Sequence, residues 1–558
     1  MWLTPALLIY CISMNRPKNV TQLSTETFDI CIIGGGASGA GCALDAALRG
    51  YKVALIDRKD FASETSSRST KLIHGGVRYL EQAFMKLDLG QLKQVRHGLE
   101  ERRIVLKNAP HLAHPLALLT PVFSWFEGLY YGIGLKIYDW FANDSTLPKG
   151  KWLTKKEVLK RMPTLRKETL HSAVLYYDGQ LDDARYCLAL AQSASEKGVV
   201  VANYVEVTGF VKNEDSQLSS ALVTDTLSDQ SFAIQSRIFI NCTGTFADTI
   251  RHMANPKLPV RMRPSKGVHV VLPFETLNST DAMLIPKTSD GRVVFAIPFE
   301  GKLLVGTTDT EYKNPELEPI LIEEEVDFLL ETLRPYVKKL PERQDVQAGF
   351  GGLRPLLAAD PTKSTKRLTR DHEVEHDDVS NLVSLLGGKW TTYRLMAKDT
   401  LDKVDELFGE NKACLTADYP LAGSIGYEPE AWKLIKEQTA LSEETCRQIN
   451  GRYGSRYPEI ITLITQNPDL AQRLVPAYPY LWAEVIYAVQ HEMAVSPRDI
   501  LARRLRLEIT DWQATLQCLP VVCDLMEKEL NWSSETREKM EKTYAEQLQV
   551  YCKSAGLL

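Results

Sequence analysis

Apolar and polar residues alternate with different periods in different parts of the chain. Residues 27–57 contain a short β-branched run, a cluster of glycines, an alanine-rich stretch and a second apolar run, which predicts strand, turn, helix, strand. Residues 185–197 have helical periodicity, and residues 198–240 alternate in the short apolar pieces that are typical of strands. The first half of the chain is therefore predicted to fold as an α/β region.

The second half divides into a strand-rich part and a helical part. Short apolar runs such as GVHVVLP, RVVFAIPF and KLLVGTTD occur within residues 265–356, and helical periodicity prevails after residue 400. A polar stretch at 409–428 has the composition of a linker. These patterns predict an N-terminal extension over 1–26, an α/β region over 27–408 with an inserted mixed-sheet subdomain at about 265–356, and a C-terminal helical domain over 425–558.

Composition excludes several classes of protein. The chain has 558 residues, 44% of them hydrophobic and 25% charged, and its net charge of −5 provides no basic field for nucleic acid. Its ten cysteines include no Cys-x-x-Cys pair, which argues against a zinc site and against a disulfide framework and fits a reducing compartment. We therefore expect a multidomain globular protein with no metal site and no nucleic-acid partner.

Two apolar stretches bear on a membrane contact. The opening MWLTPALLIYCISM is too short to span a bilayer and has no basic leader, so we interpret residues 1–13 as an optional extension with Met14 as an alternative start. The aromatic segment at 121–141 is interrupted by charges and does not reach the roughly 18 apolar residues of a spanning helix. It fits an interfacial membrane contact and a buried core helix equally well.

The clearest chemical signal lies where the first predicted strand meets the first predicted helix. Gly34, Gly36 and Gly39 in IIGGGASG form a G-x-G-x-x-G pattern. The first glycine permits a tight turn, the second lets the backbone approach a pyrophosphate, and the third allows close packing of the helix. Asp57 ends the next strand, where an acid accepts hydrogen bonds from a ribose. The pattern predicts a dinucleotide site but does not distinguish FAD from NAD.

Two further segments have residues suited to a bound dinucleotide. FINCTGTFAD carries Thr243 and Gly244 at the end of a short predicted strand, where a turn of small residues can pass close to a cofactor. The stretch SETSSRSTKLIHGGVRYLEQ at 63–82 is rich in hydroxyl groups, which is typical of a linker. Its histidine, its cations and its Gly-Gly pair favour a binding loop instead.

These segments belong to a longer ordered series of motifs. DICIIGGGASGAG, TSSRSTKLIHGGVRYLEQ, NCTGTFAD, SKGVHVVLP, VGTTDTEY, GGLRPL, TRDHEV and LLGGKWTTYRLMA follow one another from about residue 27 to 400. The series resembles the FAD-dependent glycerol-3-phosphate dehydrogenase family, and SPRDILARRLRLEI is similar to that family's C-terminal helical domain. The resemblance implies an α/β fold with a Rossmann-type FAD domain of glutathione-reductase type. It also implies oxidation of sn-glycerol 3-phosphate to dihydroxyacetone phosphate by hydride transfer to the flavin.

The acceptor and the location follow from the resemblance alone. It implies that electrons pass to a membrane quinone, in an enzyme of glycerol metabolism that is cytoplasmic and peripheral on the cytoplasmic membrane, and it leaves a homodimer open. The arginine-rich SPRDILARRLRLEI is compatible with a membrane-surface or dimer contact. We prefer to interpret it as an amphipathic helix that covers the FAD domain.

Oxidising a phosphorylated secondary alcohol requires a base for the hydroxyl proton and cations for the phosphate. Imidazole suits the base, and His74 is our first candidate, with His269 second. Arg78, Arg354 and Lys389 each follow glycines and are candidates for binding the phosphate or for stabilising alkoxide charge. The resemblance places in the substrate pocket Arg78, Tyr79, Arg354 and Lys389, with Thr391 nearby.

Hydroxyl and glycine residues are the expected contacts of FAD. The serine and threonine residues within 63–70, which we call the hydroxyl run, can bind the pyrophosphate and the flavin edge. The resemblance adds a main-chain contact of Val207 with the adenine and a turn around Gly388 at the flavin. The expected cofactor-binding residues are Gly34, Gly36, Gly39, Asp57, Ser66, Ser67, Thr70, Lys71, Val207, Thr243, Gly244, Gly388 and Thr392, with Thr391 shared with the substrate.

Three other functions remain open from the sequence. A glycerol-3-phosphate oxidase would use the same pocket and deliver electrons to oxygen. An amino-acid or sarcosine-type flavin oxidase shares the glycine motif but has no need of several phosphate-binding cations. A non-catalytic flavin-binding or membrane-docking module would not require the polar cluster around His74 and Arg78.

Overall fold

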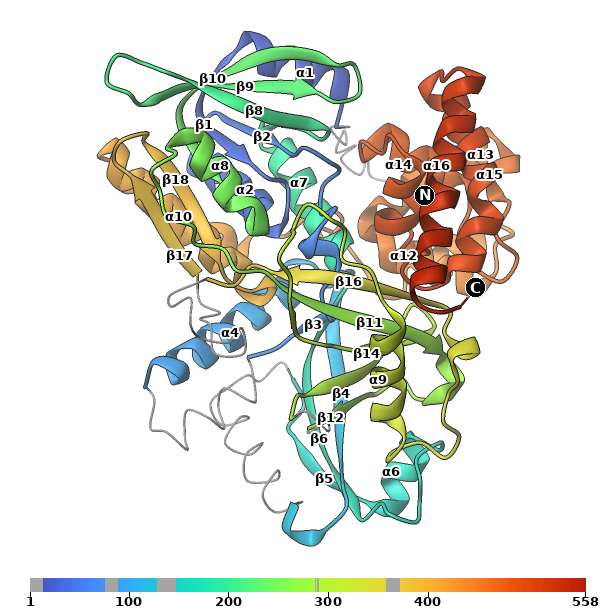
Figure 1. Cartoon of the computed structure of the whole chain (residues 1–558). Coiled ribbons are helices and arrows are strands. Elements are labelled where there is room, and N and C mark those ends of the chain that lie inside the picture. The colour runs from blue at the N-terminus through green and yellow to red at the C-terminus, as the bar shows by residue number, and fades with distance from the viewer. Residues whose placement is uncertain are drawn as a thin grey trace, which may run out of the picture.

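The computed structural model describes residues 14–75, 89–127, 147–286, 288, 291–357 and 372–557. Two β-sheets and a group of C-terminal helices make up this part of the chain (Figure 1). The predicted Arg78 and Tyr79, and most of the aromatic segment at 121–141, lie outside the described residues.

The first sheet is a mainly parallel sheet with the strand order β17-β18-β10-β1-β2-β7. Pairing is parallel from β18 to β7 and antiparallel for β17, while β8 and β9 form a hairpin that extends from β10. The strands are β1 (Thr27–Ile33), β2 (Val53–Ile56), β7 (Val200–Ala202), β8 (Val205–Lys212), β9 (Leu218–Asp225), β10 (Gln230–Asn241), β17 (His372–Asp377) and β18 (Leu382–Gly387).

Helices cover both faces of this sheet, and the central strand β1 shows why. Ile30 and Ile32 belong to one hydrophobic cluster, while Cys31 and Ile33 belong to another, because successive side chains of a strand point to opposite faces. The first cluster includes residues of α2 (Ala37–Leu48), α7 (Asp183–Glu196) and α10 (Tyr393–Phe408), and the second includes residues of α1 (Arg16–Thr25) and α8 (Ala247–Ala254). The predicted α/β region is thus a doubly covered parallel sheet.

The helix α1 corrects one predicted boundary. We expected residues 1–26 to be an extension, but Leu23 is fully buried and the Arg16 guanidinium forms an ion pair with Asp225 over 2.7 Å. The side chain of Asn19 also donates to the carbonyl oxygen of Val201 at the edge strand β7. Residues 16–25 are therefore part of the folded α/β region.

The second sheet is mixed and larger than predicted. It contains strands from residues 72–181 as well as from 265–354, so the predicted insertion at about 265–356 covers only part of it. The two groups of strands form one sheet because β12 pairs with β4 in parallel. The strands are β3 (Leu72–Ile73), β4 (Ala113–Val122), β5 (Lys151–Thr154), β6 (Ser172–Leu181), β11 (Ser265–Pro273), β12 (Ala282–Ile285), β13 (Val294–Phe299), β14 (Lys302–Gly306), β15 (Thr310–Glu311) and β16 (Ala348–Arg354).

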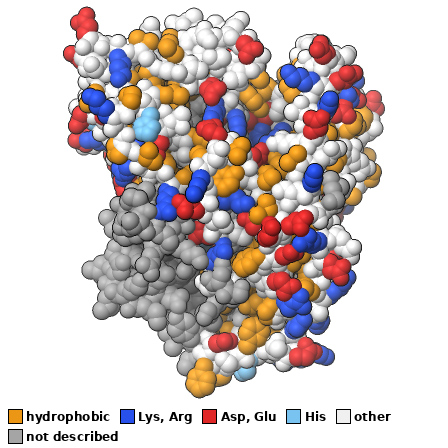
Figure 2. Space-filling model, viewed as in Figure 1, with side chains coloured by type: hydrophobic (Ala, Val, Ile, Leu, Met, Phe, Trp, Pro, Cys, Tyr) orange, Lys and Arg blue, Asp and Glu red, His pale blue; other side chains and the backbone are white. Residues whose placement is uncertain are grey.

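The C-terminal helices pack beside both sheets and share a continuous core with the second one (Figure 1). On the face in Figure 2 they carry acidic and basic side chains intermixed rather than a field of one sign. The helices are α11 (Trp432–Gln438), α12 (Glu443–Tyr453), α13 (Tyr457–Gln466), α14 (Trp482–His491), α15 (Trp512–Leu530) and α16 (Ser534–Ser554). Remaining helices are α4 (Leu89–Asn108), α6 (Lys155–Arg161) and α9 (Glu323–Leu333).

A membrane-spanning helix, a metal site and a disulfide are each absent from the described residues. Within them, no helix is both long and apolar enough to cross a bilayer, no group of side chains is arranged to hold a metal ion, and all nine cysteines are free thiols. At the start of the aromatic segment, the side chains of Trp125 and Phe126 are 56% and 78% exposed, so this end of the segment is not a buried core helix.

Candidate active site

The glycine turn between β1 and α2 has the geometry that the sequence predicts. Gly34 adopts a φ of 109°, and a Cβ atom there would lie 2.7 Å from the carbonyl oxygen of Cys242. A Cβ atom at Gly39 would lie 1.8 Å from the carbonyl oxygen of Gly34, so the helix packs on the turn at a distance that only glycine allows. The predicted tight turn and close helix packing are both confirmed.

The N-terminus of α2 is open toward a cleft. Gly36 is its N-cap and provides no side-chain cap, and the amide of Ala37 donates to the Ser66 hydroxyl over 2.9 Å. Helix N-termini carry partial positive charge and free N–H groups, which suits them to phosphate. The first turn of α2 and the hydroxyl run are therefore side by side, as a pyrophosphate site requires.

Asp57 follows β2 beside this turn. Its carboxylate accepts the amide of Gly35 over 2.6 Å and the amide of Lys59 over 2.8 Å. Burial raises the pKa of Asp57 to about 6, although these two amide donors oppose the shift. The position at the carboxyl end of the second parallel strand is the one that a ribose-binding acid occupies in this type of fold.

A cleft between the two sheets brings many of the predicted residues together. About 1630 Å³ of space lies within it, part of which is open to solvent, and its lining comes from the glycine turn after β1 and from β11 and β16. The predicted residues that line it are Gly36, Ser66, Thr70, His74, Gly244, His269, Arg354, Gly388, Lys389, Thr391 and Thr392.

Arg354 is held at the cleft by the second sheet. Its guanidinium donates to the hydroxyl of Thr307 over 3.1 Å and to the carbonyl oxygen of Thr308 over 2.9 Å, and Asp309 lies 3.5 Å away. A Cβ atom at Gly267 would lie 2.4 Å from this guanidinium, so glycine leaves the room that Arg354 occupies. A quarter of the Arg354 side chain stays exposed, which leaves its charge accessible to an anion.

The two candidate bases line the same cleft from different strands. His269 in β11 is buried, its Nε2 lies 3.2 Å from the Thr70 hydroxyl, and its ring stacks on Phe350 at 4.7 Å. Burial, and then the charges of Lys71 and Arg354, hold the pKa of His269 well below its ordinary value, so the ring is neutral at pH 7. His74 follows β3 and stacks on Phe295 at 6.3 Å.

Lys71 corrects the predicted set of cofactor ligands. Its ammonium group is fully buried and donates to both carboxylate oxygens of Asp183, over 2.8 and 2.7 Å, and to the carbonyl oxygen of Ser67 over 2.7 Å. Thr70 lines the cleft, whereas Lys71 adopts a left-handed φ of 61° and its side chain points to Asp183 instead. The Lys71 side chain therefore supports the loop instead of binding the cofactor.

Other predicted cofactor residues lie close to the cleft without lining it. The Ser67 hydroxyl donates to the carbonyl oxygen of Glu64, and the Thr243 hydroxyl donates to Asn241 over 2.7 Å. The Val207 side chain is buried in the hydrophobic cluster under β8, and its main-chain contact with adenine stays a prediction. Gly34, Gly39 and Asp57 shape the turn behind the cleft.

Among the cleft-lining residues that were not predicted from the sequence, two hold other cleft residues in place. Thr307 fixes the Arg354 guanidinium, and the indole N–H of Trp390 donates to the carbonyl oxygen of Ser66 over 2.9 Å. A signal for Trp390 was present in LLGGKWTTYRLMA, because a tryptophan between glycines and a helix commonly needs a partner for its N–H. No local pattern marked Thr307.

The arginine-rich segment SPRDILARRLRLEI is buried between the C-terminal helices and the first sheet. Arg503, Arg504 and Arg506 are 7%, 1% and 0% exposed, so the alternative of a membrane-surface or dimer contact is wrong for these three side chains. The preferred interpretation is confirmed for the position of the segment, which covers the α/β region. Its conformation differs, because Asp499–Arg504 form a short π-type turn rather than an amphipathic α-helix. The cations face buried carboxylates because unpaired buried charges are unstable.

The fold and this site define a class of protein. A parallel sheet with a glycine turn, an open helix N-terminus and an acid after the second strand is the dinucleotide site of an oxidoreductase. The cradle fits the pyrophosphate of a dinucleotide such as FAD, because a Cβ atom at Gly36 would come 2.9 Å from the Ser66 hydroxyl and would fill the space between the helix and the hydroxyl run.

Comparisons with known proteins specify the family. Residues 29–400 match the family described as FAD dependent oxidoreductase, and residues 414–537 match the C-terminal domain of alpha-glycerophosphate oxidase. The chain is 39% identical to the mitochondrial glycerol-3-phosphate dehydrogenase of Mesocricetus auratus, over 95% of this chain and 75% of the relative. It is also 39% identical to the mitochondrial glycerol-3-phosphate dehydrogenase SDP6 of Arabidopsis thaliana, over 94% of this chain and 86% of the relative.

A solved structure agrees with these matches. The glycerol-3-phosphate dehydrogenase from Bacillus halodurans complexed with FAD superposes with a TM-score of 0.79 at 30% identity, over 96% of this chain and 98% of that one. The chain belongs to the family of FAD-dependent glycerol-3-phosphate dehydrogenases. The predicted family, fold class and FAD cofactor are confirmed.

Proposed function

We propose that this protein oxidises sn-glycerol 3-phosphate to dihydroxyacetone phosphate, with FAD as its cofactor and a membrane quinone as the final acceptor. The observation that carries the proposal is the cleft itself, where Arg354, Lys389, His74 and His269 meet the glycine turn that fits FAD. The relatives that are named glycerol-3-phosphate dehydrogenases, of which the chain covers 75% and 86%, support the same reaction.

The chemistry divides between the cofactor and the side chains. When bound, FAD supplies the two-electron acceptor for the C–H bond of the alcohol carbon. The protein supplies a base for the hydroxyl proton, and either of the two histidines at the cleft can take this role. The neutral ring of His269 is in the protonation state that accepts a proton, and its Nε2 is oriented by the Thr70 hydroxyl.

Cations at the cleft account for the choice of a phosphorylated substrate. Arg354 presents a guanidinium that Thr307 and Thr308 hold in place, and such a preorganised donor binds a phosphate at low entropic cost. Lys389 lines the same cleft at the start of the turn over Trp390–Thr392. The predicted contributions of Arg78 and Tyr79 remain predictions, since both lie outside the described residues.

The final acceptor requires access to a membrane. We propose a peripheral contact with the quinone-containing cytoplasmic membrane, supported by the exposed rings of Trp125 and Phe126 at the far end of the second sheet. Aromatic side chains of this kind are favoured at the membrane–water interface. A homodimer is compatible with this arrangement, and the proposal leaves the oligomeric state to be measured.

One kinetic experiment separates this function from its rivals. The purified holoenzyme is given glycerol 3-phosphate or, in a parallel assay, amino acids, each with a soluble quinone analogue, and quinone reduction and oxygen uptake are followed together. The proposal predicts quinone reduction with little oxygen uptake. Stoichiometric oxygen uptake with peroxide release would establish an oxidase, and turnover of amino acids in place of glycerol 3-phosphate would establish an amine oxidase.

A further inference from the structure

Arginines from the C-terminal region reach the back of the cofactor cradle. Arg503, Arg504 and Arg506, which we call the arginine cluster, are buried and contact two segments of the α/β region, residues 57–62 and 66–71. These two segments carry five of the residues predicted for FAD outside the glycine turn, namely Asp57, Ser66, Ser67, Thr70 and Lys71. No residue of the described C-terminal helices lines the cleft itself.

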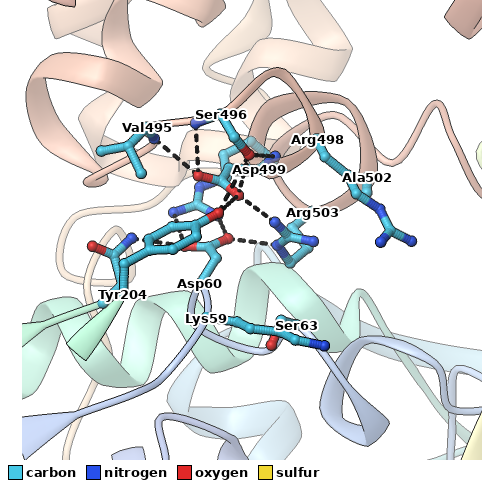
Figure 3. A network of polar contacts seen from close by, with 12 residues as sticks. Lys59, Asp60, Ser63, Tyr204, Val495, Ser496, Arg498, Asp499, Ala502 and Arg503 are labelled. Atoms are coloured by element: carbon cyan, nitrogen blue, oxygen red, sulfur yellow. Dashed lines mark hydrogen bonds and ion pairs between the residues drawn. The ribbon is translucent and has the colours of Figure 1, made fainter. Parts of the chain in front are cut away.

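The first segment is held through Asp60 (Figure 3). The Asp60 carboxylate is fully buried, and the guanidinium groups of Arg503 and Arg504 both donate to it, with one contact of Arg504 at 3.0 Å. Burial alone would favour the protonated acid, but the charges of Arg504 and Arg503 hold the pKa of Asp60 below its ordinary value. The ion pair is therefore complete at neutral pH.

Asp60 is connected to the glycine turn through its chain neighbours, which form hydrogen bonds with Gly35. Asp57, three residues earlier, accepts the amide of Gly35, and the amide of Ala62 donates back to the carbonyl oxygen of Gly35 over 3.2 Å. A Cβ atom at Gly35 would lie 2.6 Å from the Phe61 ring, so this segment packs directly on the turn. A displacement of Asp60 would thus move the ribose-binding acid and the turn together.

A second carboxylate, that of Asp499, also holds Arg503. Arg503 also donates to Asp499, which accepts the Tyr204 hydroxyl over 2.7 Å and the amides of Val495 and Ser496 over 2.9 and 3.0 Å (Figure 3). Tyr204 lies between β7 and β8 of the first sheet. The guanidinium therefore has a fixed direction between two carboxylates, which a flexible surface pair would not give.

The second segment is held through Arg506. One nitrogen of its guanidinium donates to the carbonyl oxygen of Ser67 and to Asp183, each over 2.8 Å. Asp183 in turn accepts the amide of Ser69 over 2.9 Å and the ammonium group of Lys71. Both ends of the Ser67–Ser69 backbone are thereby fixed, and the adjoining residues Ser66 and Thr70 are the ones that line the cleft.

We propose that the arginine cluster positions the FAD-binding cradle: Arg503 and Arg504 hold the segment of Asp57 through Asp60, and Arg506 holds the hydroxyl run through Ser67 and Asp183. The C-terminal region is then part of the cofactor site although it does not touch the cleft. This inference rests on FAD binding in the proposed function but not on the identity of the substrate. It differs from simple domain docking, which would stabilise the fold without affecting how tightly FAD is held.

The first test compares Arg506→Lys with Arg456→Gln. Lysine keeps the charge but lacks the guanidinium fork, whereas Arg456 forms an ion pair with Glu196 at the end of α7 and contacts neither cradle segment. FAD release from each holoenzyme is followed by the rise of flavin fluorescence, and Tm is measured in parallel. We expect release from Arg506→Lys to be faster by about tenfold or more, because charge-assisted hydrogen bonds are lost. Arg456→Gln is expected to remain within about twofold of the parent for release even where its Tm falls.

A second pair of variants keeps the test decisive if Arg506→Lys does not give folded holoenzyme. Arg503→Lys retains the charge beside Asp60, and Tyr204→Phe removes only the hydroxyl that orients Asp499. Both are expected to accelerate FAD release, Tyr204→Phe by about two- to fivefold for one lost hydrogen bond. Release rates equal to that of Arg456→Gln in the folded variants would overturn the proposal. Should the parent retain FAD but fail to be reduced by glycerol 3-phosphate, the substrate assignment fails while this comparison still decides the inference.

Discussion

The indole N–H of Trp390 donates to the main-chain carbonyl oxygen of Ser66 over 2.9 Å. The bond joins two cleft-lining segments that are 324 residues apart in sequence. The Trp390 ring also meets Tyr186 and Tyr393 edge-on, at 5.3 and 5.4 Å. The Trp390 side chain therefore connects the turn before α10 to the hydroxyl run at the cleft.

Replacing this tryptophan should loosen the cofactor without unfolding the protein. Trp390→Phe keeps an aromatic ring but removes the N–H, at a cost of about 1 kcal/mol for one hydrogen bond. FAD release from the holoenzyme should therefore accelerate by about fivefold, as measured by flavin fluorescence. Trp152→Phe, at a 40% exposed position in β5, is the matched control and should release FAD at the parent rate. Equal rates for both variants would contradict the role of the Trp390 bond.

The glycine turn predicts a severe effect of a single methyl group. Gly39→Ala would place Cβ 1.8 Å from the Gly34 carbonyl oxygen, and the main chain there has no room to yield. The variant should lose FAD on purification or fail to fold, as judged by flavin absorbance and circular dichroism. Gly451→Ala in α12 meets no atom within 4 Å and should instead stabilise the protein by about 0.5–1 kcal/mol. A yellow, fully stable Gly39→Ala protein would rule out the turn geometry.

The proposed phosphate contact of Arg354 can be tested separately from cofactor binding. Arg354→Ala removes a cation that approaches the cleft from β16, where Thr307 and Thr308 hold its guanidinium. Losing one charge-assisted phosphate contact should cost about 2–4 kcal/mol, so kcat/KM should fall by roughly 30- to 1000-fold. FAD content should remain at the parent level. Arg334→Ala, which breaks an exposed pair with Glu331, serves as the control and should leave kcat/KM unchanged.

If Asp57 binds the ribose as predicted, FAD release should depend on pH. Its pKa is about 6 in the folded protein, raised by burial above the ordinary value of 3.8, so the folded state favours the protonated acid between these two values. A protonated Asp57 accepts hydrogen bonds from a ribose less well than the carboxylate does. FAD release should therefore accelerate as the pH falls from 7.5 through 6 to 5. Asp57→Asn should release FAD quickly at every pH, and an unchanged pH profile in this variant would exclude Asp57 as the cause.

The parts of the site that the sequence could predict depend on local chemistry. Gly34, Gly39 and Asp57 lie within one strand, turn, helix, strand unit, and the constraints on them arise from neighbours in that unit. The order of motifs then specified the family and the cofactor. Arg354 and His269 could be placed at one cleft only by resemblance, because β16 and β11 become neighbours through sheet register.

The parts that could not be predicted depend on distant partners. Lys71 looked like a cofactor ligand beside the hydroxyl run, but its partner Asp183 lies 112 residues away and draws the ammonium group out of the cleft. The sequence predicted that SPRDILARRLRLEI covers the FAD domain, but it could not identify the partner of Arg503 and Arg504, because Asp60 lies more than 400 residues earlier. The extent of the second sheet was missed for the same reason, since β4 and β12 meet only in three dimensions.

Anaerobic reduction of the flavin tests the central claim most directly. The holoenzyme is mixed with glycerol 3-phosphate under argon and the visible flavin absorbance is recorded, with glycerol and a panel of amino acids as controls. The account predicts that glycerol 3-phosphate bleaches the flavin, that glycerol lacks the phosphate needed to do so at the same concentration, and that amino acids leave the spectrum unchanged. Bleaching by an amino acid together with an unchanged spectrum in glycerol 3-phosphate would contradict it.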